Sequence, residues 1–356
     1  MGSLTPTATV PTEQQFVSKE AASGVVNSFN GASIHFSLDN EDLLIKCEIA
    51  GDRDMFQLGR ARASNDIVID IPSVSRQACR VIINRSEPHE AKIYASGFDK
   101  TNRIILPQHV TKAEVNGSWD ALTTNGVMIL HPPHRNGMMH VSLQEICDWE
   151  PRWREVSVMG KLYHSNADKS TPNMIADLVN DEDNVLLDGT LVDIAGVILM
   201  WRTTEACERF NDDALQQNIE KLNISHNICP VMFQTLMFPK DQNDQVDEEK
   251  DFHAFLTCGH VYSGNKNIAG LSQCGLCKMK VSENDNRLVK LRLGFEPYLS
   301  TDGELPSWFF RDCGHVVSEK TAKYWSRINF TDGKRCPFCF KKLLSPPIAQ
   351  LFYQQQ

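Results

Sequence analysis

The residues best suited to chemistry are cysteines and histidines that repeat one phrase near the C-terminus. Six of the eleven cysteines fall in the last hundred residues. Each phrase places a Cys-Gly-His triplet ahead of a Cys-x-x-Cys pair. The candidate ligands are Cys258, His260, Cys274 and Cys277 in the first phrase, and Cys313, His315, Cys336 and Cys339 in the second.

Sets of four thiolate and imidazole ligands are typical of structural zinc sites, and a Cys-x-x-Cys turn can direct two thiolates at one ion. The sequence therefore predicts two zinc ions. Catalytic zinc usually keeps three protein ligands and an open position, whereas these eight ligands divide evenly, which favours structural sites. The spacing leaves two pairings open: each phrase closes its own site, or the pairs interleave in a RING-like cross-brace. We expect the cross-brace.

A disulfide framework is the main competing interpretation of the clustered cysteines. The lack of a signal peptide and the paired histidines argue against it. Metal binding would supply much of the folding free energy of the tail, which has few long apolar runs. The other cysteines are scattered and are predicted to be reduced core thiols: Cys47, Cys79, Cys147, Cys207 and Cys229.

The composition describes a globular chain of 356 residues, 41% of them hydrophobic, which is long enough for two or three domains. Thirty-six basic residues against forty-five acidic ones give a net charge of -9, which disfavours binding to nucleic acid or anionic membranes. No apolar run is long enough to span a bilayer, and the N-terminus lacks a signal-peptide pattern. We predict a cytoplasmic protein.

The upstream chain is predicted to be mostly β, with a flexible N-terminal segment at 1–33 and an antiparallel β-sandwich at 34–205. A helix at 211–223 and an acidic linker are predicted within 206–250, ahead of a small two-zinc domain at 251–356. The predicted strands lie within 43–49, 66–71, 79–83, 91–95, 104–106, 127–130, 153–158 and 196–201.

Several phrases resemble the Pellino family of ubiquitin ligases, whose variant RING repeats the same order of Cys, His, Cys and Cys. The resemblance covers about residues 40 to 345. The phrases that carry it are Asp54-Met55-Phe56-Gln57-Leu58-Gly59-Arg60, Ser75-Arg76-Gln77-Ala78-Cys79-Arg80, Ala95-Ser96-Gly97-Phe98-Asp99, Leu122-Thr123-Thr124-Asn125-Gly126-Val127, Trp153-Arg154-Glu155-Val156-Ser157-Val158, Leu199-Met200-Trp201-Arg202-Thr203, Cys313-Gly314-His315-Val316-Val317-Ser318-Glu319-Lys320-Thr321, Tyr324-Trp325-Ser326 and Cys336-Pro337-Phe338-Cys339.

The resemblance implies that the sandwich is a forkhead-associated (FHA) domain, which binds phosphothreonine. A dianionic phosphate needs a guanidinium and hydroxyl or amide donors, and an extended peptide needs a side-chain amide. By resemblance, Arg60 and Ser75 hold the phosphate with Arg76 beside them, while Thr124 and Asn125 hold the peptide backbone. FHA domains generally carry a histidine where this chain has Ala78, a departure that Pellino sequences share.

The resemblance implies a RING-type ubiquitin ligase that binds a phosphorylated kinase client and a ubiquitin-conjugating enzyme charged with ubiquitin. The implied clients are interleukin-1-receptor-associated kinases of Toll-like innate immune signalling. Two alternatives stay open: a ligase-deficient phosphothreonine-binding adaptor or decoy, and a structural zinc scaffold that binds no phosphopeptide. Gly275 stands where family members usually have proline, and the segment from Arg60 to Ser75 is short, as in a compact divergent or pathogen-encoded copy.

Overall fold

The computed structural model describes the parts of the chain that matter for the predicted sites. The described residues are 2–6, 27–28, 33–39, 42–48, 53–106, 110–115, 118–165, 174, 177–224, 228–229, 231–239, 251–264, 271–280, 288–296 and 306–353. They divide into two compact units. The N-terminal unit takes in described residues up to Met138 and Arg152–Thr204, and the C-terminal unit takes in Met139–Pro151 and the described residues from Glu205 onward.

Two sheets of the N-terminal unit share one apolar core, as a β-sandwich requires. Leu58 and Val81 from one sheet and Ile129, Val192 and Trp201 from the other belong to the same buried cluster. The larger sheet has the antiparallel order β1 (Gly2–Pro6), β17 (Val197–Thr203), β16 (Leu191–Ile194), β12 (Met128–Leu130), β13 (Arg154–Val156), β14 (Leu162–His164) and β15 (Leu178–Val179). The other has the order β2 (Asn27–Ser28), β5 (Arg53–Gly59), β7 (Cys79–Asn84) and β8 (Ala91–Ala95), with β6 (Ile67–Val68) beside β5.

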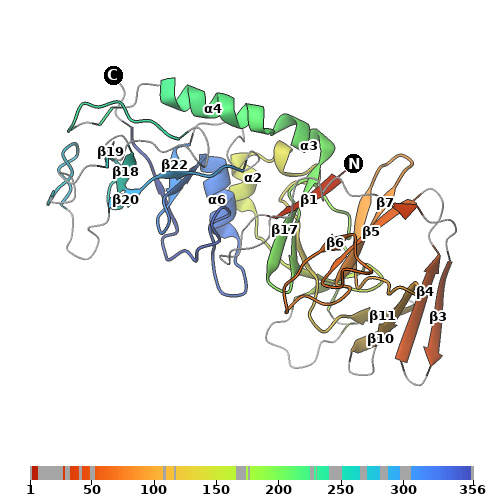
Figure 1. The fold of residues 1–356 in the computed structure, drawn as a ribbon. Coiled ribbons are helices and arrows are strands. Elements are labelled where there is room, and N and C mark those ends of the chain that lie inside the picture. The colour runs from red at the N-terminus through yellow and green to blue at the C-terminus, as the bar shows by residue number, and fades with distance from the viewer. Residues whose placement is uncertain are drawn as a thin grey trace. The chain divides into compact units, whose positions relative to one another are not determined.

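Further strands extend the N-terminal unit (Figure 1). Strands β3 (Ser33–Asp39), β4 (Asp42–Glu48) and β9 (Arg103–Leu106) form a three-stranded sheet, and β10 (Thr111–Val115) and β11 (Ser118–Leu122) form a hairpin. Each of the eight predicted runs contains a strand, although 66–71 is extended only over β6. The mostly β fold class is therefore confirmed.

The first residues differ from the prediction of a flexible segment at 1–33. Gly2–Pro6 forms β1, which pairs with β17 in the register Leu4 to Trp201, so the prediction was wrong for these residues. A polar sequence without periodicity can still add an edge strand, because the partner strand supplies the backbone hydrogen bonds. Residues 7–26 lie outside the described parts of the chain.

The C-terminal unit combines short strands with helices. The helix predicted at 211–223 is α4 (Asp212–Ile224), which buries Leu215, Ile219 and Leu222, and the Asn211 side chain accepts a hydrogen bond from the Ala214 amide at its start. The unit also contains α2 (Leu143–Asp148), α3 (Thr204–Arg209), α6 (Glu319–Arg327), β18 (Phe252–Phe255), β19 (Val261–Ser263), β20 (Leu288–Lys290), β21 (Arg292–Leu293), β22 (Trp308–Phe310), β23 (His315–Val317) and β24 (Ile348–Gln350).

Helix α2 lies within the sequence of the predicted sandwich but packs in the C-terminal unit, beside α6 (Figure 1). The rings of Trp149 and Tyr324 stack at 4.9 Å between centroids, and Arg327 Nε donates to the Trp149 carbonyl at 2.8 Å. A capping box between Ser142 and Glu145 starts α2. The contiguous domain predicted at 34–205 did not anticipate this excursion.

The two Cys-His phrases fold into matching modules, here named module A (residues 252–293) and module B (residues 307–352). Each begins with a hairpin, β18–β19 in module A and β22–β23 in module B, and ends with a returning strand that pairs antiparallel with the first strand of its own hairpin. His253 pairs with Lys290, and Trp308 pairs with Gln350. The modules thus share one topology.

The returning strands also cross to the other module. Arg292 of module A pairs in parallel with His315 of module B, and Phe352 of module B pairs in parallel with His260 of module A. The backbone amide of Arg292 donates to the Gly314 carbonyl, and that of Phe352 donates to the Gly259 carbonyl, both at 2.9 Å. The two modules are therefore interlocked by backbone pairing in both directions, through strand β21 in one direction and an isolated bridge in the other, an arrangement named strand exchange here.

Candidate functional site

Both Cys-x-x-Cys pairs lie on turns with the same backbone hydrogen bonds. In module A the Lys278 amide donates to the Cys274 carbonyl at 2.9 Å, and in module B the Phe340 amide donates to the Cys336 carbonyl at 2.9 Å. Lys278 and Phe340 both adopt positive φ, at 60° and 56°. These turns direct the two thiols of each pair to the same side, as a metal-binding turn requires.

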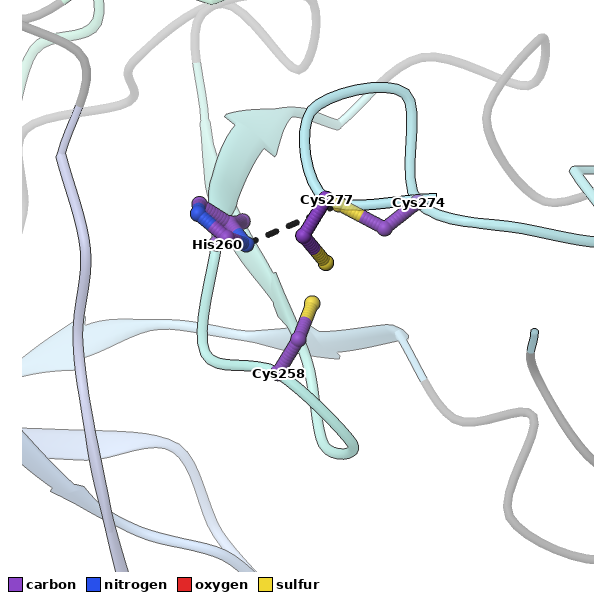
Figure 2. Close-up of side chains that lie close together, drawn as sticks. All are labelled: Cys258, His260, Cys274 and Cys277. Atoms are coloured by element: carbon purple, nitrogen blue, oxygen red, sulfur yellow. Dashed lines mark hydrogen bonds between the residues drawn. The ribbon is translucent and has the colours of Figure 1, made fainter. Parts of the chain in front are cut away.

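Figure 2 shows the ligand set of module A, in which the side chains converge from the β18–β19 hairpin and the Cys-x-x-Cys turn. The donor atoms of Cys258, His260, Cys274 and Cys277 lie within 4.8 Å of one another. His260 Nδ1 is 3.6 Å from Cys274 Sγ. A third group supports the cluster, because the Tyr262 hydroxyl lies 2.9 Å from Cys274 Sγ.

Module B brings Cys313, His315, Cys336 and Cys339 together in the same way, with all donor atoms within 4.8 Å. His315 Nδ1 lies 3.4 Å from Cys313 Sγ and 3.6 Å from Cys336 Sγ. Helix α6, which begins at the N-cap Ser318, separates the hairpin from the Cys-x-x-Cys turn. Every predicted ligand therefore lies in one of the two clusters.

The donor sets fit a tetrahedral metal ion. Bond lengths of about 2.3 Å to sulfur and 2.0 Å to nitrogen place neighbouring donors roughly 3.5 to 3.8 Å apart, close to the separations observed. Burial raises the pKa of the Cys258 thiol to about 12 and also raises the pKa of Cys336, so a cation is needed to hold these groups as thiolates. Burial lowers the pKa of His260, which favours the neutral imidazole that binds metals. The sets are consistent with zinc.

The expected cross-brace was wrong. Each cluster draws all four ligands from one phrase, so Cys258 and His260 share a site with Cys274 and Cys277 rather than with the pair of module B. The interlocking that a cross-brace would supply through the ligands comes instead from the strand exchange between modules. Spacing alone did not distinguish the two arrangements.

A third turn with similar hydrogen bonds, described at residues 228–229 and 231–235, carries Cys229. The Phe233 amide donates to the Cys229 carbonyl at 2.8 Å, Phe233 has φ of 56°, and Met232 stands where the second cysteine of a metal-binding pair would be. Cys229 is buried and free, as predicted for a core thiol. The turn shape is thus independent of metal ligation.

The other scattered cysteines whose side chains are described form no disulfide. Cys79 is buried on β7, as predicted, and burial raises its pKa to about 12. Cys147 and Cys207 are half-buried on α2 and α3 rather than in a core. The side chain of Cys47 lies outside the described residues.

The residues assigned to phosphopeptide binding come from three loops, which follow β5, precede β7 and connect β11 to β12. Arg60, exposed at the end of β5, donates its backbone amide to the Ser75 carbonyl at 2.9 Å and Nε to the Val74 carbonyl at 3.2 Å. Asn125 Nδ2 donates to Ser75 Oγ at 3.0 Å and to the Ser73 carbonyl at 2.9 Å. Arg60, Ser75 and Asn125 are therefore brought together by contacts over long sequence distances.

Arg76 and Thr124 are exposed and lie next to these residues in sequence. Two glycines shape the loops. A Cβ on Gly59 would lie 2.4 Å from the Arg76 carbonyl oxygen, and Gly126 has φ of +64°. The loops therefore require the Gly-Arg and Asn-Gly sequences in which the binding residues lie.

Ser73 and Tyr262 were missed by the sequence analysis. Ser73 Oγ donates to the Ala195 carbonyl at 3.1 Å, while its own carbonyl accepts from Asn125, so it joins three loops. Tyr262 reaches a metal ligand through its hydroxyl. No local signal marks either residue, because each contact forms only in the folded chain.

No helix in the described part of the chain is long and apolar enough to cross a membrane.

Comparisons with known proteins also divide the chain into two domains, with a boundary inside α4 rather than at Glu205. A family model described as the Pellino FHA domain matches residues 4–221, and one described as the Pellino RING domain matches residues 222–356. The chain is 34% identical to E3 ubiquitin-protein ligase pellino homolog 2 of Mus musculus over 94% of its own length and 83% of the relative. It is 33% identical to Protein pellino of Drosophila melanogaster, covering 87% of this chain and 76% of the relative. With pellino homolog 3 of Mus musculus the identity is 32%, over 92% and 78%.

Proposed function

Because the chain belongs to the Pellino family, we propose that it is a RING-type E3 ubiquitin ligase directed to its clients by phosphothreonine. The N-terminal unit docks on a phosphorylated client, and the C-terminal unit recruits a ubiquitin-conjugating enzyme charged with ubiquitin. The two complete four-donor clusters carry the ligase proposal, since a RING without its metals would lack the fold that binds the conjugating enzyme.

The metal in both clusters is zinc in this proposal. Three cysteines and one histidine in a closed tetrahedral set are the usual ligands of structural zinc. When bound, the ions hold the hairpins and the Cys-x-x-Cys turns together. None of the eight ligands serves as a nucleophile, because each is committed to a metal site.

Ubiquitin transfer requires no covalent intermediate on this chain. The ligase acts by holding the thioester of the conjugating enzyme close to a lysine of the client, which raises the effective concentration of the two reactants. The contribution of the protein is therefore position and orientation. One chain therefore binds both the client, through its N-terminal unit, and the conjugating enzyme, through its C-terminal unit.

Client binding is assigned to Arg60, Ser75, Arg76, Thr124 and Asn125. A guanidinium, a hydroxyl and a side-chain amide are the donors that a phosphothreonine peptide needs. The contacts of Ser75 with Arg60 and Asn125 support this assignment, because they hold the three residues close together before any ligand binds. The clients inferred from the family are interleukin-1-receptor-associated kinases of Toll-like innate immune signalling in the cytoplasm.

Ligase activity is tested by autoubiquitination with a panel of conjugating enzymes. Wild-type chain should form ubiquitin chains, and the double variant Cys336→Ala, Cys339→Ala should not. Cys207→Ser is the matched control, because it changes a cysteine on α3 that belongs to neither cluster. Absence of chains from wild-type protein that carries two zinc ions would support the alternative of a ligase-deficient phosphothreonine-binding decoy, which Gly275 in module A keeps open.

Phosphopeptide binding is tested by fluorescence anisotropy with matched phosphothreonine and threonine peptides. Arg60→Gln should lower affinity for the phosphorylated peptide by about tenfold or more, since a charge-assisted contact is lost. Arg62→Gln is the matched control, because Arg62 is a nearby exposed arginine that pairs with Asp70. Equal binding by both variants would contradict the assigned site and favour a structural scaffold.

A further inference from the structure

Glu155, on β13, lies beside the loop that is assigned to the backbone of the client peptide. A Cβ built on Gly126 would lie 3.6 Å from Glu155 Oε1 and 4.0 Å from Met128 Sδ. Gly126 directly follows Asn125, whose Nδ2 donates to Ser75 Oγ at 3.0 Å. The Glu155 carboxylate is therefore next to the turn that presents Asn125, although it is not among the residues assigned to the peptide.

The strand register gives Glu155 an apolar setting. Glu155 pairs with Met128 of β12 on one side and with the buried Tyr163 of β14 on the other. Directly paired residues of antiparallel strands point to the same face of a sheet, so both side chains flank the carboxylate. Asp193, which pairs with Met128 from β16, accepts from the Gly196 amide at 2.7 Å. Asp193 is thus committed to its own turn, whereas Glu155 is not.

No hydrogen bond or ion pair joins the Glu155 carboxylate to any residue that the structure describes. The side chain is only half-buried, so a bound peptide can reach it. Burial raises the pKa of Glu155 to about 7, because the charged form loses part of its hydration without gaining a partner. A cation placed beside the carboxylate would offset that cost and favour the ionised form.

The surroundings of Glu155 suit a lysine or arginine side chain of the client. Such a side chain can lay its aliphatic part along Met128 and bring its charged end to the carboxylate in a charge-assisted contact. A bare metal ion is poorly matched, because one carboxylate supplies too few oxygen ligands. An acidic side chain would be repelled. The expected occupant is therefore a basic residue in the stretch of client that Asn125 holds.

We propose that Glu155 selects clients that carry a lysine or arginine close to the phosphothreonine in sequence. The inference rests on the proposed phosphothreonine binding by this unit, and adds a second feature by which a client is recognised. Arg60 and Ser75 bind the phosphate, while Glu155 binds the positive charge. Because the two places have opposite charge, they also fix the direction in which the peptide lies.

The probes are fluorescently labelled, alanine-based phosphothreonine peptides in which one flanking position at a time carries lysine, alanine or glutamate. They are titrated against the full zinc-loaded chain at about pH 8, above the pKa of Glu155, and binding is followed by fluorescence anisotropy. Lysine should bind about fivefold more tightly than alanine at one or two adjacent positions, and glutamate more weakly than alanine there. A preference for lysine at every position would reflect only the net charge of -9 and would overturn the proposal.

Variants assign the preference to the carboxylate. Glu155→Gln should remove the preference for lysine at those positions, and Glu155→Lys should reverse it in favour of glutamate. Glu114→Gln is the matched control, because it removes the same charge from an exposed side chain on β10 and should keep the preference. Binding by each variant should still require phosphorylation of the threonine, which shows that the loops are folded.

Two failures can be told apart. If the wild type shows no preference for lysine, or if the preference survives Glu155→Gln, the proposal is overturned while phosphothreonine binding stands. If the wild type binds phosphorylated and unphosphorylated peptides equally, both the selection by Glu155 and the proposed client binding are overturned.

Discussion

Modules A and B have the same topology and the same ligand types, but their surroundings differ. In module B, the Phe338 ring lies against His315 at 5.2 Å between centroids, and Phe330 links Trp325 to Phe340 in an aromatic cluster. In module A, the Cys277 side chain is exposed and Leu276 is 39% exposed, while Tyr262 contacts one ligand.

Two modules with the same metal ligands can therefore differ in how strongly their folding depends on the bound metal. A phenylalanine ring packs near the cluster histidine in both modules, since the Phe352 and His260 rings lie 5.5 Å apart between centroids. The Cys-x-x-Cys turn of module B carries its own phenylalanines, Phe338 and Phe340, whereas the turn of module A carries none and leaves Cys277 exposed. Strand exchange opposes this difference, because β21 of module A joins the sheet of module B, and Phe352 of module B forms a backbone bridge to His260 of module A. The following predictions separate the two influences.

The largest effect is expected from removing one ligand. Cys274→Ser in module A or Cys336→Ser in module B should each abolish most of the roughly 10 kcal/mol that a structural zinc site supplies to folding. Because the strands are exchanged, zinc content measured by mass spectrometry should fall below one ion per chain in both variants. Retention of one full equivalent, with an unchanged circular dichroism spectrum, would show that the modules are independent.

The next largest effect is expected from adding a Cβ at the glycines that lie against the backbone of the other module. In Gly314→Ala the Cβ would lie 2.0 Å from the Lys290 carbonyl oxygen, and in Gly259→Ala it would lie 1.9 Å from that of Gln350. Each variant should lose about 3 kcal/mol or more of stability in chemical denaturation, from steric overlap added to positive φ.

Gly196→Ala is the control for these two variants. Gly196 also has positive φ, at +91°, but its Cβ would have no neighbour within 4 Å. Gly196→Ala should therefore lower the free energy of unfolding by only about 1 kcal/mol, the cost of placing alanine at positive φ. Equal losses in all three variants would mean that the strand contacts contribute little.

The order of metal release tests the difference in packing directly. With a chelator and a thiol-alkylating reagent present, Cys274 and Cys277 should be modified before Cys336 and Cys339, because Cys277 is exposed and the module B turn is packed against aromatic rings. Mass spectrometry of digested samples taken over time gives the order. Simultaneous modification would indicate that strand exchange outweighs local packing.

Tyr262→Phe should have a local effect on module A. Loss of the hydroxyl beside Cys274 Sγ removes a group that orients a ligand, and should weaken zinc binding in that module by about tenfold. Competition with a fluorescent zinc indicator measures this change. Tyr353→Phe is the control, since its hydroxyl donates to the Pro306 carbonyl rather than to a ligand. A matching loss in the control would assign the effect to packing.

The smallest effect is expected at Gly275, where module B has Pro337. A Cβ at Gly275 would make ordinary contacts with Val231 Cγ2 at 3.5 Å and the Tyr262 hydroxyl at 3.7 Å. Gly275→Ala should therefore change stability by no more than about 0.5 kcal/mol in thermal unfolding. A larger loss of stability would mean that the turn does not accept a side chain at position 275, despite the space around it.

Much of the fold and the candidate site could be predicted because the determining interactions are local. The α4 helix follows from the spacing of Leu215, Ile219 and Leu222 after Asn211, and each predicted strand run contains a strand. The helix α2 was not predicted to join the C-terminal unit, because its stacking partner Tyr324 is distant in the sequence. The edge strand β1 was missed for the same reason, since its hydrogen bonds are supplied by β17.

The sequence by itself determined the eight ligands, since a Cys-x-x-Cys turn and a Cys-Gly-His triplet depend on residues a few positions apart. Tertiary structure alone decided that each phrase closes its own cluster, that the modules exchange strands, and that Asn125 reaches Ser75 across 50 residues of sequence. The physical reason is that such pairings are selected by packing and hydrogen bonding in the whole fold, after the cost of closing long loops, and no short stretch of sequence encodes that balance.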